Sequence, residues 1–180
     1  MKRAFSICLF SVFSIFIFSC KKSSSDNKYY IKFTANDTSI AWLNGHIQVG
    51  VFQNLYDSTK TDFVFVSDNH NQDTSFSMQF SLTGKSIPAA TYSSTNSSLS
   101  MYVDYNLDNN NMGNTPLAPD YYIDDVNGMP PSTFTINITS ITSSEVRGTF
   151  TANYLTSYFT GPATTVTITK GEFYAPVVHQ

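Results

Sequence analysis

Apolar and polar residues alternate along much of the chain, which is the pattern of β-strands with one buried and one wet face. The alternation is plainest in residues 75–82, where three serines and a glutamine separate two phenylalanines, a methionine and a leucine. The same pattern predicts strands in four further segments: 99–105, 134–138, 146–154 and 166–168. No segment shows the spacing of an amphipathic helix.

Other signals predict three more strands. Residues 29–34 and 47–52 have the composition of shorter strands, and Asn44-Gly45, between Trp42 and Ile47, predicts a turn. The run Phe-Val-Phe-Val at 63–66 is apolar on both faces. That run predicts a central strand covered on two sides.

The alternation loses phase at two places. Ile141 follows Ile138, and Phe173 follows Ile168 with Gly171 between them. Because one extra residue moves every later side chain to the other face, each place predicts a β-bulge or the passage of a strand from one sheet to another.

Composition supports the same fold class, because Thr, Ser, Tyr, Phe, Val and Ile are common and helix formers are scarce. About 150 residues from position 29 onward suit a single domain. The sequence therefore predicts an all-β protein, an antiparallel β-sandwich or open barrel of roughly 8–10 strands spanning residues 29–180.

The N-terminus has the layout of an export signal. Lys2 and Arg3 precede a nearly unbroken apolar run, 4–18, which is shorter than the roughly 20 residues of a membrane-spanning helix. The run ends in Ile17-Phe18-Ser19-Cys20, which resembles the lipobox of bacterial lipoproteins. The resemblance implies removal of residues 1–19 and acylation of Cys20, whereas the alternative is an ordinary secretory signal with an incidental cysteine.

Cleavage before Cys20 would leave one cysteine, because Cys8 leaves with the signal, so neither a disulfide framework nor a cysteine metal site is expected. Loss of Lys2 and Arg3 from the ten basic residues leaves eight against 13 acidic ones, a formal charge of −5. This balance argues against a nucleic-acid partner. Residues 20–28 lack apolar side chains after the cysteine and predict a flexible tether whose Lys21-Lys22 meets lipid head groups.

The C-terminal half resembles a known group of proteins. Residues 134–139 read Phe-Thr-Ile-Asn-Ile-Thr, 146–152 read Val-Arg-Gly-Thr-Phe-Thr-Ala, and 166–173 read Val-Thr-Ile-Thr-Lys-Gly-Glu-Phe. This looks like small lipoproteins of unknown function in Bacteroidota, which end in a Gly-Thr-Phe strand and a Gly-x-Phe strand. The segment 87–92, Ile-Pro-Ala-Ala-Thr-Tyr, is similar to their Pro-Ala-Gly-Thr-Tyr element. The resemblance implies an outer-membrane location, facing the periplasm or the cell surface, and brings no activity.

One candidate metal site stands out. Asp104, Asn106 and Asp108 have the alternate spacing of the first ligands in a calcium loop, and Asp120 could complete an irregular Ca²⁺ site. The pattern lacks the usual Gly at Asn109 and the bidentate Glu at Thr115. The alternative is a solvated Asn-rich loop without a cofactor.

The longest stretch without alternation runs from Leu107 to Pro131, and loops of that length are commonly functional or disordered. Trp42, Tyr121 and Tyr122 could form an aromatic platform for a glycan or a protein partner, while the alternative is burial or an edge-strand position.

Catalytic signals are weak. His46, His70 and His179 are far apart, and no Gly-x-Ser-x-Gly turn occurs. No catalytic residue is assigned. The sequence favours a membrane-anchored, non-enzymatic binding module of the cell envelope; a structural or assembly lipoprotein is the alternative, and a hydrolase a distant one.

Overall fold

A computed structural model of the chain describes residues 28–43, 46–69, 74–96, 99, 101–106, 120–123, 131–157 and 164–178. All regular elements in these ranges are strands, which confirms the all-β prediction. None of the described residues belongs to a helix long and apolar enough to cross a membrane. The strands are β1 (Tyr30–Ala35), β2 (Thr38–Leu43), β3 (Ile47–Gln53), β4 (Lys60–Asp68), β5 (Ser75–Thr83), β6 (Thr91–Ser93), β7 (Met101–Asn106), β8 (Asp120–Tyr122), β9 (Thr133–Ile141), β10 (Glu145–Ser157) and β11 (Thr164–Val178).

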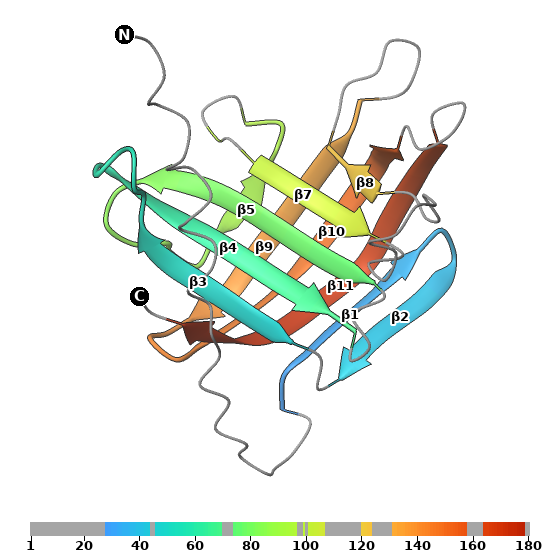
Figure 1. Cartoon of the computed structure of the whole chain (residues 1–180), viewed down its shortest axis with the longest axis horizontal. Coiled ribbons are helices and arrows are strands. Elements are labelled where there is room, and N and C mark those ends of the chain that lie inside the picture. The colour runs from blue at the N-terminus through green and yellow to red at the C-terminus, as the bar shows by residue number, and fades with distance from the viewer. Residues whose placement is uncertain are drawn as a thin grey trace, which may run out of the picture.

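The strands form two layers that join into a nearly closed barrel (Figure 1). A front layer runs β3-β4-β5-β7-β8, and a back layer runs β2-β1-β11-β10-β9-β6. The layers connect where β11 pairs with β3 and where β8 pairs with β10. The prediction of a sandwich or open barrel is therefore confirmed in its broad form.

The sheet is mixed, so the prediction of a purely antiparallel arrangement is wrong. Strand β11 pairs antiparallel with β1 as far as Tyr174, but its last residues pair parallel with β3, Val177 with Val49 and Val178 with Gly50. The cause is the length of β11, which extends past β1 and crosses to the front layer. Three short strands that the alternation does not reveal, β2, β6 and β8, raise the described total to 11.

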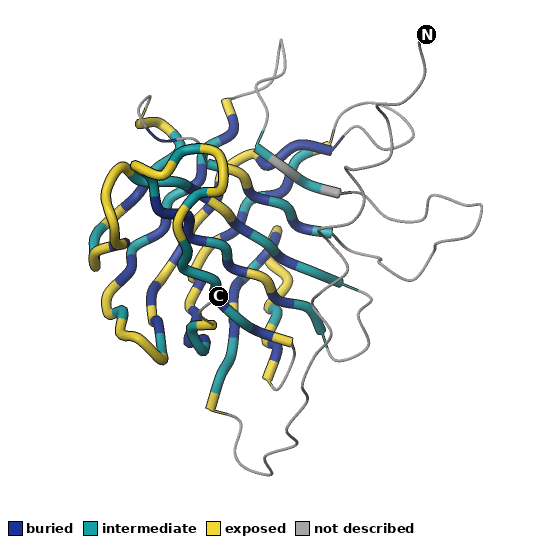
Figure 2. Tube along the Cα trace, turned by 60° about the vertical axis from the view of Figure 1, so that its left-hand side comes forward, coloured by how far each residue is buried: buried dark blue, intermediate teal, exposed yellow. Residues whose placement is uncertain are grey.

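The inner faces of the two layers form an aromatic core. Along strands such as β5 and β9, buried positions alternate with more exposed ones (Figure 2), and Phe76, Met78 and Phe80 point inward as predicted. The expectation for 63–66 is half right. Phe63 and Phe65 are fully buried, but Val66 is 40% exposed, because the back layer covers only the inner face of β4.

Both predicted losses of phase are register shifts. The β9–β10 pairing shifts between Arg147 and Gly148, opposite Ser140 and Ile138. The pairings of β11 with β1 and with β10 shift at the same place, beside Lys170. A third shift, which the alternation does not predict, lies in β10 where Tyr154 has a φ of 55°.

The N-terminal strands form a tight hairpin. Asn36 and Asp37 connect β1 to β2 with φ angles of 43° and 69°, and this pair of positive values is typical of a type I′ turn. The predicted turn at Asn44-Gly45 lies outside the described residues. The strands that flank it, β2 and β3, do not pair with each other, so this connection leads from the back layer to the front layer.

Candidate functional site

The outer face of the back layer carries an open depression with a volume of about 310 Å³. It spans β9, β10 and β11, and its lining is Thr135, Asn137, Thr149, Phe150, Thr151, Lys170, Gly171 and Glu172. Apart from Phe150 and Gly171, these are polar residues. The depression therefore offers hydroxyl, amide, ammonium and carboxylate groups on three neighbouring strands.

Cross-strand register brings these residues together. Glu172 lies opposite Thr149, and Thr149 lies opposite Asn137, so the three form one row across the sheet. Thr151 lies opposite Thr135 in a parallel row. Residues that share a row on one face of a sheet have neighbouring side chains. The outward positions of the strands therefore build the depression from parts of the chain that are far apart in sequence.

A β-bulge shapes the floor of the depression. Gly171 pairs with Phe150, and a Cβ at Gly171 would lie 2.4 Å from the Phe150 carbonyl oxygen and 2.7 Å from its ring. The position therefore accepts only glycine without a backbone shift. Lys170, directly before it, takes the left-handed conformation of the bulge with a φ of 53°. A non-glycine residue in that conformation costs about 1–2 kcal/mol.

Tyr30 and Lys32 extend the site onto β1. The Tyr30 hydroxyl donates a hydrogen bond of 2.5 Å to Glu172 Oε1, and this bond, with burial, raises the pKa of Tyr30. The Lys32 ammonium group lies 4.3 Å from the centre of the Tyr30 ring. The Glu172 carboxylate is thus held in place at the edge of the depression.

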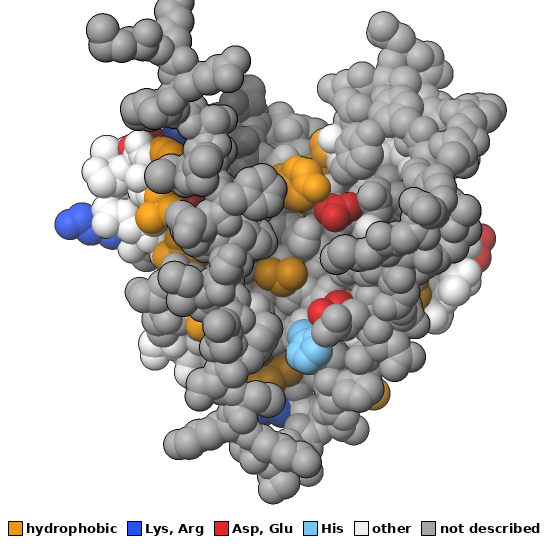
Figure 3. All heavy atoms as spheres, viewed as in Figure 1, with side chains coloured by type: hydrophobic (Ala, Val, Ile, Leu, Met, Phe, Trp, Pro, Cys, Tyr) orange, Lys and Arg blue, Asp and Glu red, His pale blue; other side chains and the backbone are white. Residues whose placement is uncertain are grey.

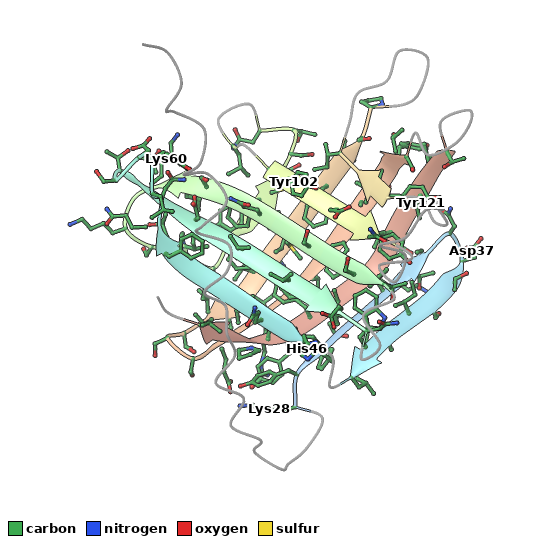
Figure 4. All side chains as sticks on the ribbon, viewed as in Figure 1. Lys28, Asp37, His46, Lys60, Tyr102 and Tyr121 are labelled. Atoms are coloured by element: carbon green, nitrogen blue, oxygen red, sulfur yellow. The ribbon has the colours of Figure 1, made fainter. Side chains whose placement is uncertain are left out.

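A second cluster lies beside the first, at the start of the described chain. The Arg147 guanidinium lies 4.0 Å from the centre of the Tyr174 ring, and the Tyr174 hydroxyl donates a hydrogen bond of 2.5 Å to Glu145. Lys28 forms an ion pair with Glu145 and lies near the rings of Tyr29 and Tyr174. This cluster connects the residues just before β1 to the start of β10. Lys28 is labelled in the lower part of Figure 4.

Basic side chains collect on this face. Four of the six lysine and arginine residues that the structure describes, Lys28, Lys32, Arg147 and Lys170, belong to the outer side of the back layer. The outer side of the front layer carries Asp62 and Asp68 of β4 and Asp104 of β7, together with Lys60 at the start of β4. Figure 3 shows that side, with acidic side chains and a histidine on the visible surface and basic ones at its margins.

The three residues of the predicted aromatic platform lie on two strands, β2 and β8. Trp42 is 9% exposed and packs edge-on against Phe33, with ring centres 5.7 Å apart, so it belongs to the core. Tyr121 on β8 is half-buried and stacks on Tyr105 at 6.3 Å (Figure 4). Tyr122 pairs through its backbone with Asp104 and Thr156. For Trp42, the structure favours the alternative of burial.

The predicted calcium ligands begin in a strand rather than a loop. Asp104 and Asn106 belong to β7, and Asn106 lies opposite Asp120 of β8. Asp108 lies outside the described residues. Among the described residues, no three His, Cys, Asp or Glu side chains are grouped as metal ligands would be. A strand keeps alternate residues about 7 Å apart, which does not form the tight turn of a calcium loop.

One histidine has an acidic partner. His46 Nδ1 lies 3.1 Å from Asp68 Oδ1 at the edge of the front layer (Figure 4). Neither residue lines the depression, which is on the other layer. His70 and His179 lie outside the described residues, as do Cys20, the signal segment, the tether up to residue 27 and most of the segment 107–131.

The depression was not predicted from the sequence. The available signal was the loss of phase at Gly171 together with charged residues on either side of it, Lys170 and Glu172. Comparison with known proteins finds no matching family model, no matching curated protein and no matching solved structure.

Proposed function

We propose that the protein is a lipid-anchored envelope protein, acylated at Cys20 and held at the outer membrane, whose domain is a non-enzymatic glycan-binding module. The observation that carries the proposal is the depression at the β11 bulge, where polar side chains from three strands surround an open volume of about 310 Å³. The N-terminal signal pattern and the resemblance to small Bacteroidota lipoproteins support the location.

The lining suits a polyhydroxylated ligand. Threonine hydroxyls both donate and accept hydrogen bonds, as sugar hydroxyls do, and the Asn137 amide offers both functions as well. Three of the lining side chains are threonines with stiff χ1 angles on paired strands. Little side-chain entropy is therefore lost on binding, which favours affinity at an open site.

The chemistry of the depression favours binding over catalysis. Glu172 is the one carboxylate in the lining, and it accepts a hydrogen bond from Tyr30. The nearest approach to a catalytic pair among the described residues, His46 with Asp68, lies on the front layer. A hydrolase would bring such a pair to the site that holds the substrate.

The test is a glycan array probed with the lipidated protein in detergent, followed by titration of the ligands that bind. Thr149→Val and Thr151→Val keep the shape of the side chain and remove the hydroxyl, so each is expected to weaken binding about three- to tenfold. Thr83→Val, an exposed threonine at the end of β5, is the matched control. An array without binding, or equal affinities in all variants, would overturn the proposal.

A structural or assembly role is the second candidate, and strand β2 favours it. Among the described strands, β2 pairs only with β1 and ends the sheet. It contains no charged residue, and Leu43 is 47% exposed. Ala35 and Thr38 flank the two-residue turn and exchange backbone hydrogen bonds. Because the direction of these bonds alternates along a strand, the backbone N–H and C=O groups of Ser39, Ala41 and Leu43 face away from β1. An uncharged edge of this kind can pair with another strand.

This second candidate commits to a second copy of the chain, with the two β2 strands antiparallel about Ala41. Analytical ultracentrifugation of the detergent-solubilised protein would then show a dimer that Ala41→Lys dissociates and that Ser77→Lys, on the front layer, leaves intact. A monomer at all concentrations would remove this candidate and leave the binding module.

A further inference from the structure

We infer that the depression recognises the carboxylate of an acidic glycan and that Lys170 is the residue that binds it; this inference rests on the proposed glycan-binding function. The first observation is conformational. Lys170 has a φ of 53°, although glycine or asparagine would adopt that conformation at lower cost. Strained residues of this kind are concentrated at functional sites, where the surrounding structure holds them.

The bulge lies where β11 is packed closely against β10. A Cβ at Gly171 would meet the Phe150 carbonyl oxygen at 2.4 Å, so β11 and β10 are in close contact at this point. In the pairings of β11 with both β1 and β10, the register shows that the extra residue of β11 lies directly before Gly171. Lys170 occupies that inserted position and lines the depression with its exposed side chain.

The neighbouring charges on this face are already engaged. Glu172 accepts a hydrogen bond from Tyr30, and Glu145 interacts with both Lys28 and Tyr174. Two cations lie over aromatic rings, Lys32 over Tyr30 and Arg147 over Tyr174. No described carboxylate lies within ion-pair distance of Lys170. Its ammonium group is thus the cation on this face that is available to a ligand.

The local charge favours an anion. The outer side of the back layer carries Lys28, Lys32, Arg147 and Lys170 against Glu145 and Glu172, a local excess of two positive charges on a chain whose formal charge is −3. Such an excess attracts anions toward the surface and weakens with salt.

The uncharged part of the lining completes the match. The Thr91 hydroxyl lies 3.2 Å from Asn137 Oδ1 and donates to it, so the amide has its Nδ2 hydrogens to donate to a ligand. Thr149 and Thr151 add hydroxyls one row apart. Ammonium and amide donors suit a carboxylate, and the hydroxyls suit the rest of a sugar ring. A carboxylate-bearing sugar unit satisfies both sets of groups.

The test compares an oligogalacturonate with its methyl ester, which has the same sugar rings without the charge. Calorimetric titration of the lipidated protein in detergent is expected to show the acid binding at least tenfold more tightly at low salt, with the difference falling as salt rises. Lys170→Gln should remove this preference, so that the acid and the ester bind with equal affinity. Lys85→Gln, an exposed lysine outside the depression, is the control and should change neither affinity.

Lys170→Gly separates function from folding. Glycine relieves the left-handed conformation, so this variant is expected to have a higher Tm than the original chain while losing the preference for the acid. Retention of the preference in Lys170→Gly would overturn the inference. Lys170→Gln should keep the original Tm within error, which shows that the loss of binding is local.

The remaining outcomes are also distinct. One outcome would overturn this inference and leave the proposed function standing. In that outcome neutral glycans bind on an array, the acid and the ester bind with equal affinity, and Lys170→Gln has no effect. An array on which neither acidic nor neutral glycans bind would overturn both. Binding of a glutamate-rich peptide in the absence of any glycan would replace the glycan class by an acidic peptide and overturn both as stated.

Discussion

At the scale of single residues, the core is a network of phenylalanine rings. The Phe150 ring centre lies 4.9 Å from that of Phe76 and 6.1 Å from that of Phe134, and Phe173 and Phe33 also lie within about 6.4 Å. Phe80 stacks on Phe63 at 4.9 Å. The Phe76–Phe150 pair joins the front and back layers, and the other pairs pack rings of the same layer together.

Deletion of these rings is expected to be costly. Phe80→Ala and Phe150→Ala should each lower the free energy of unfolding by about 3–5 kcal/mol, because a buried ring is lost and a cavity remains. Ser77→Ala, on the outer side of β5, should be nearly silent. Denaturant melts measure the three values. If all three agreed within error, the assignment of the inner and outer faces would be wrong.

A buried tyrosine predicts a loss of stability at high pH. Burial, and to a lesser extent Tyr121, raises the pKa of Tyr105 to about 12 from its ordinary value of 10.0. The neutral phenol is thus favoured in the folded state, so its full contribution is present below pH 10 and is lost as the pH rises from about 10 to 12. The loss should reach about 3 kcal/mol.

Denaturant melts between pH 9 and 12 measure this effect, and Tyr105→Phe is the matched variant because it keeps the ring and removes the titrating group. The variant should lose less stability across that range than the original chain. Equal slopes in the two proteins would show that Tyr105 does not couple ionisation to folding.

At the scale of elements, Gly171 lets the bulge in β11 lie in close contact with β10. Gly171→Ala would place a Cβ against the carbonyl oxygen of Phe150, a backbone atom that cannot turn aside. We expect a loss of at least about 2 kcal/mol in the free energy of unfolding.

Gly50→Ala is the control for that prediction. Its Cβ would lie 3.0 Å from the end of the Phe52 ring, a side chain that can rotate away. We expect a change within about 1 kcal/mol, since lower entropy of the unfolded chain partly offsets the contact. Denaturant melts of both variants decide the matter, and similar losses would contradict the special role of Gly171.

At the scale of the whole molecule, the proposed acyl chains on Cys20 would hold the domain at the membrane. Cys20→Ala should leave the protein exported but remove its acyl chains, which would supply nearly all of its membrane affinity. Metabolic labelling with a fatty acid, followed by membrane fractionation, measures both properties. Label retained by the Cys20→Ala protein would contradict lipidation at this residue, and Ser19→Ala is the control that should keep the label.

The alternation of the sequence by itself determined the strand class, the inward faces of β5, β9 and β10, and the two bulges near Thr139 and Lys170. These features are local, because a period of two residues and its interruption are visible within a few positions. The type I′ turn at Asn36-Asp37 is also a local feature, but it was not predicted, because its sequence signal is weaker than that of Asn-Gly.

Only the tertiary structure decided which strands pair, and that choice made the candidate site. Strand β11 is long enough to serve both layers, and no local pattern records that its end runs parallel to β3. The row from Glu172 through Thr149 to Asn137 exists because of the register between three strands. The sequence left both a surface position and burial open for Trp42, and packing against Phe33 decided for burial. Pairing and packing depend on contacts between distant residues, and the alternation of a single strand contains no information about its partner.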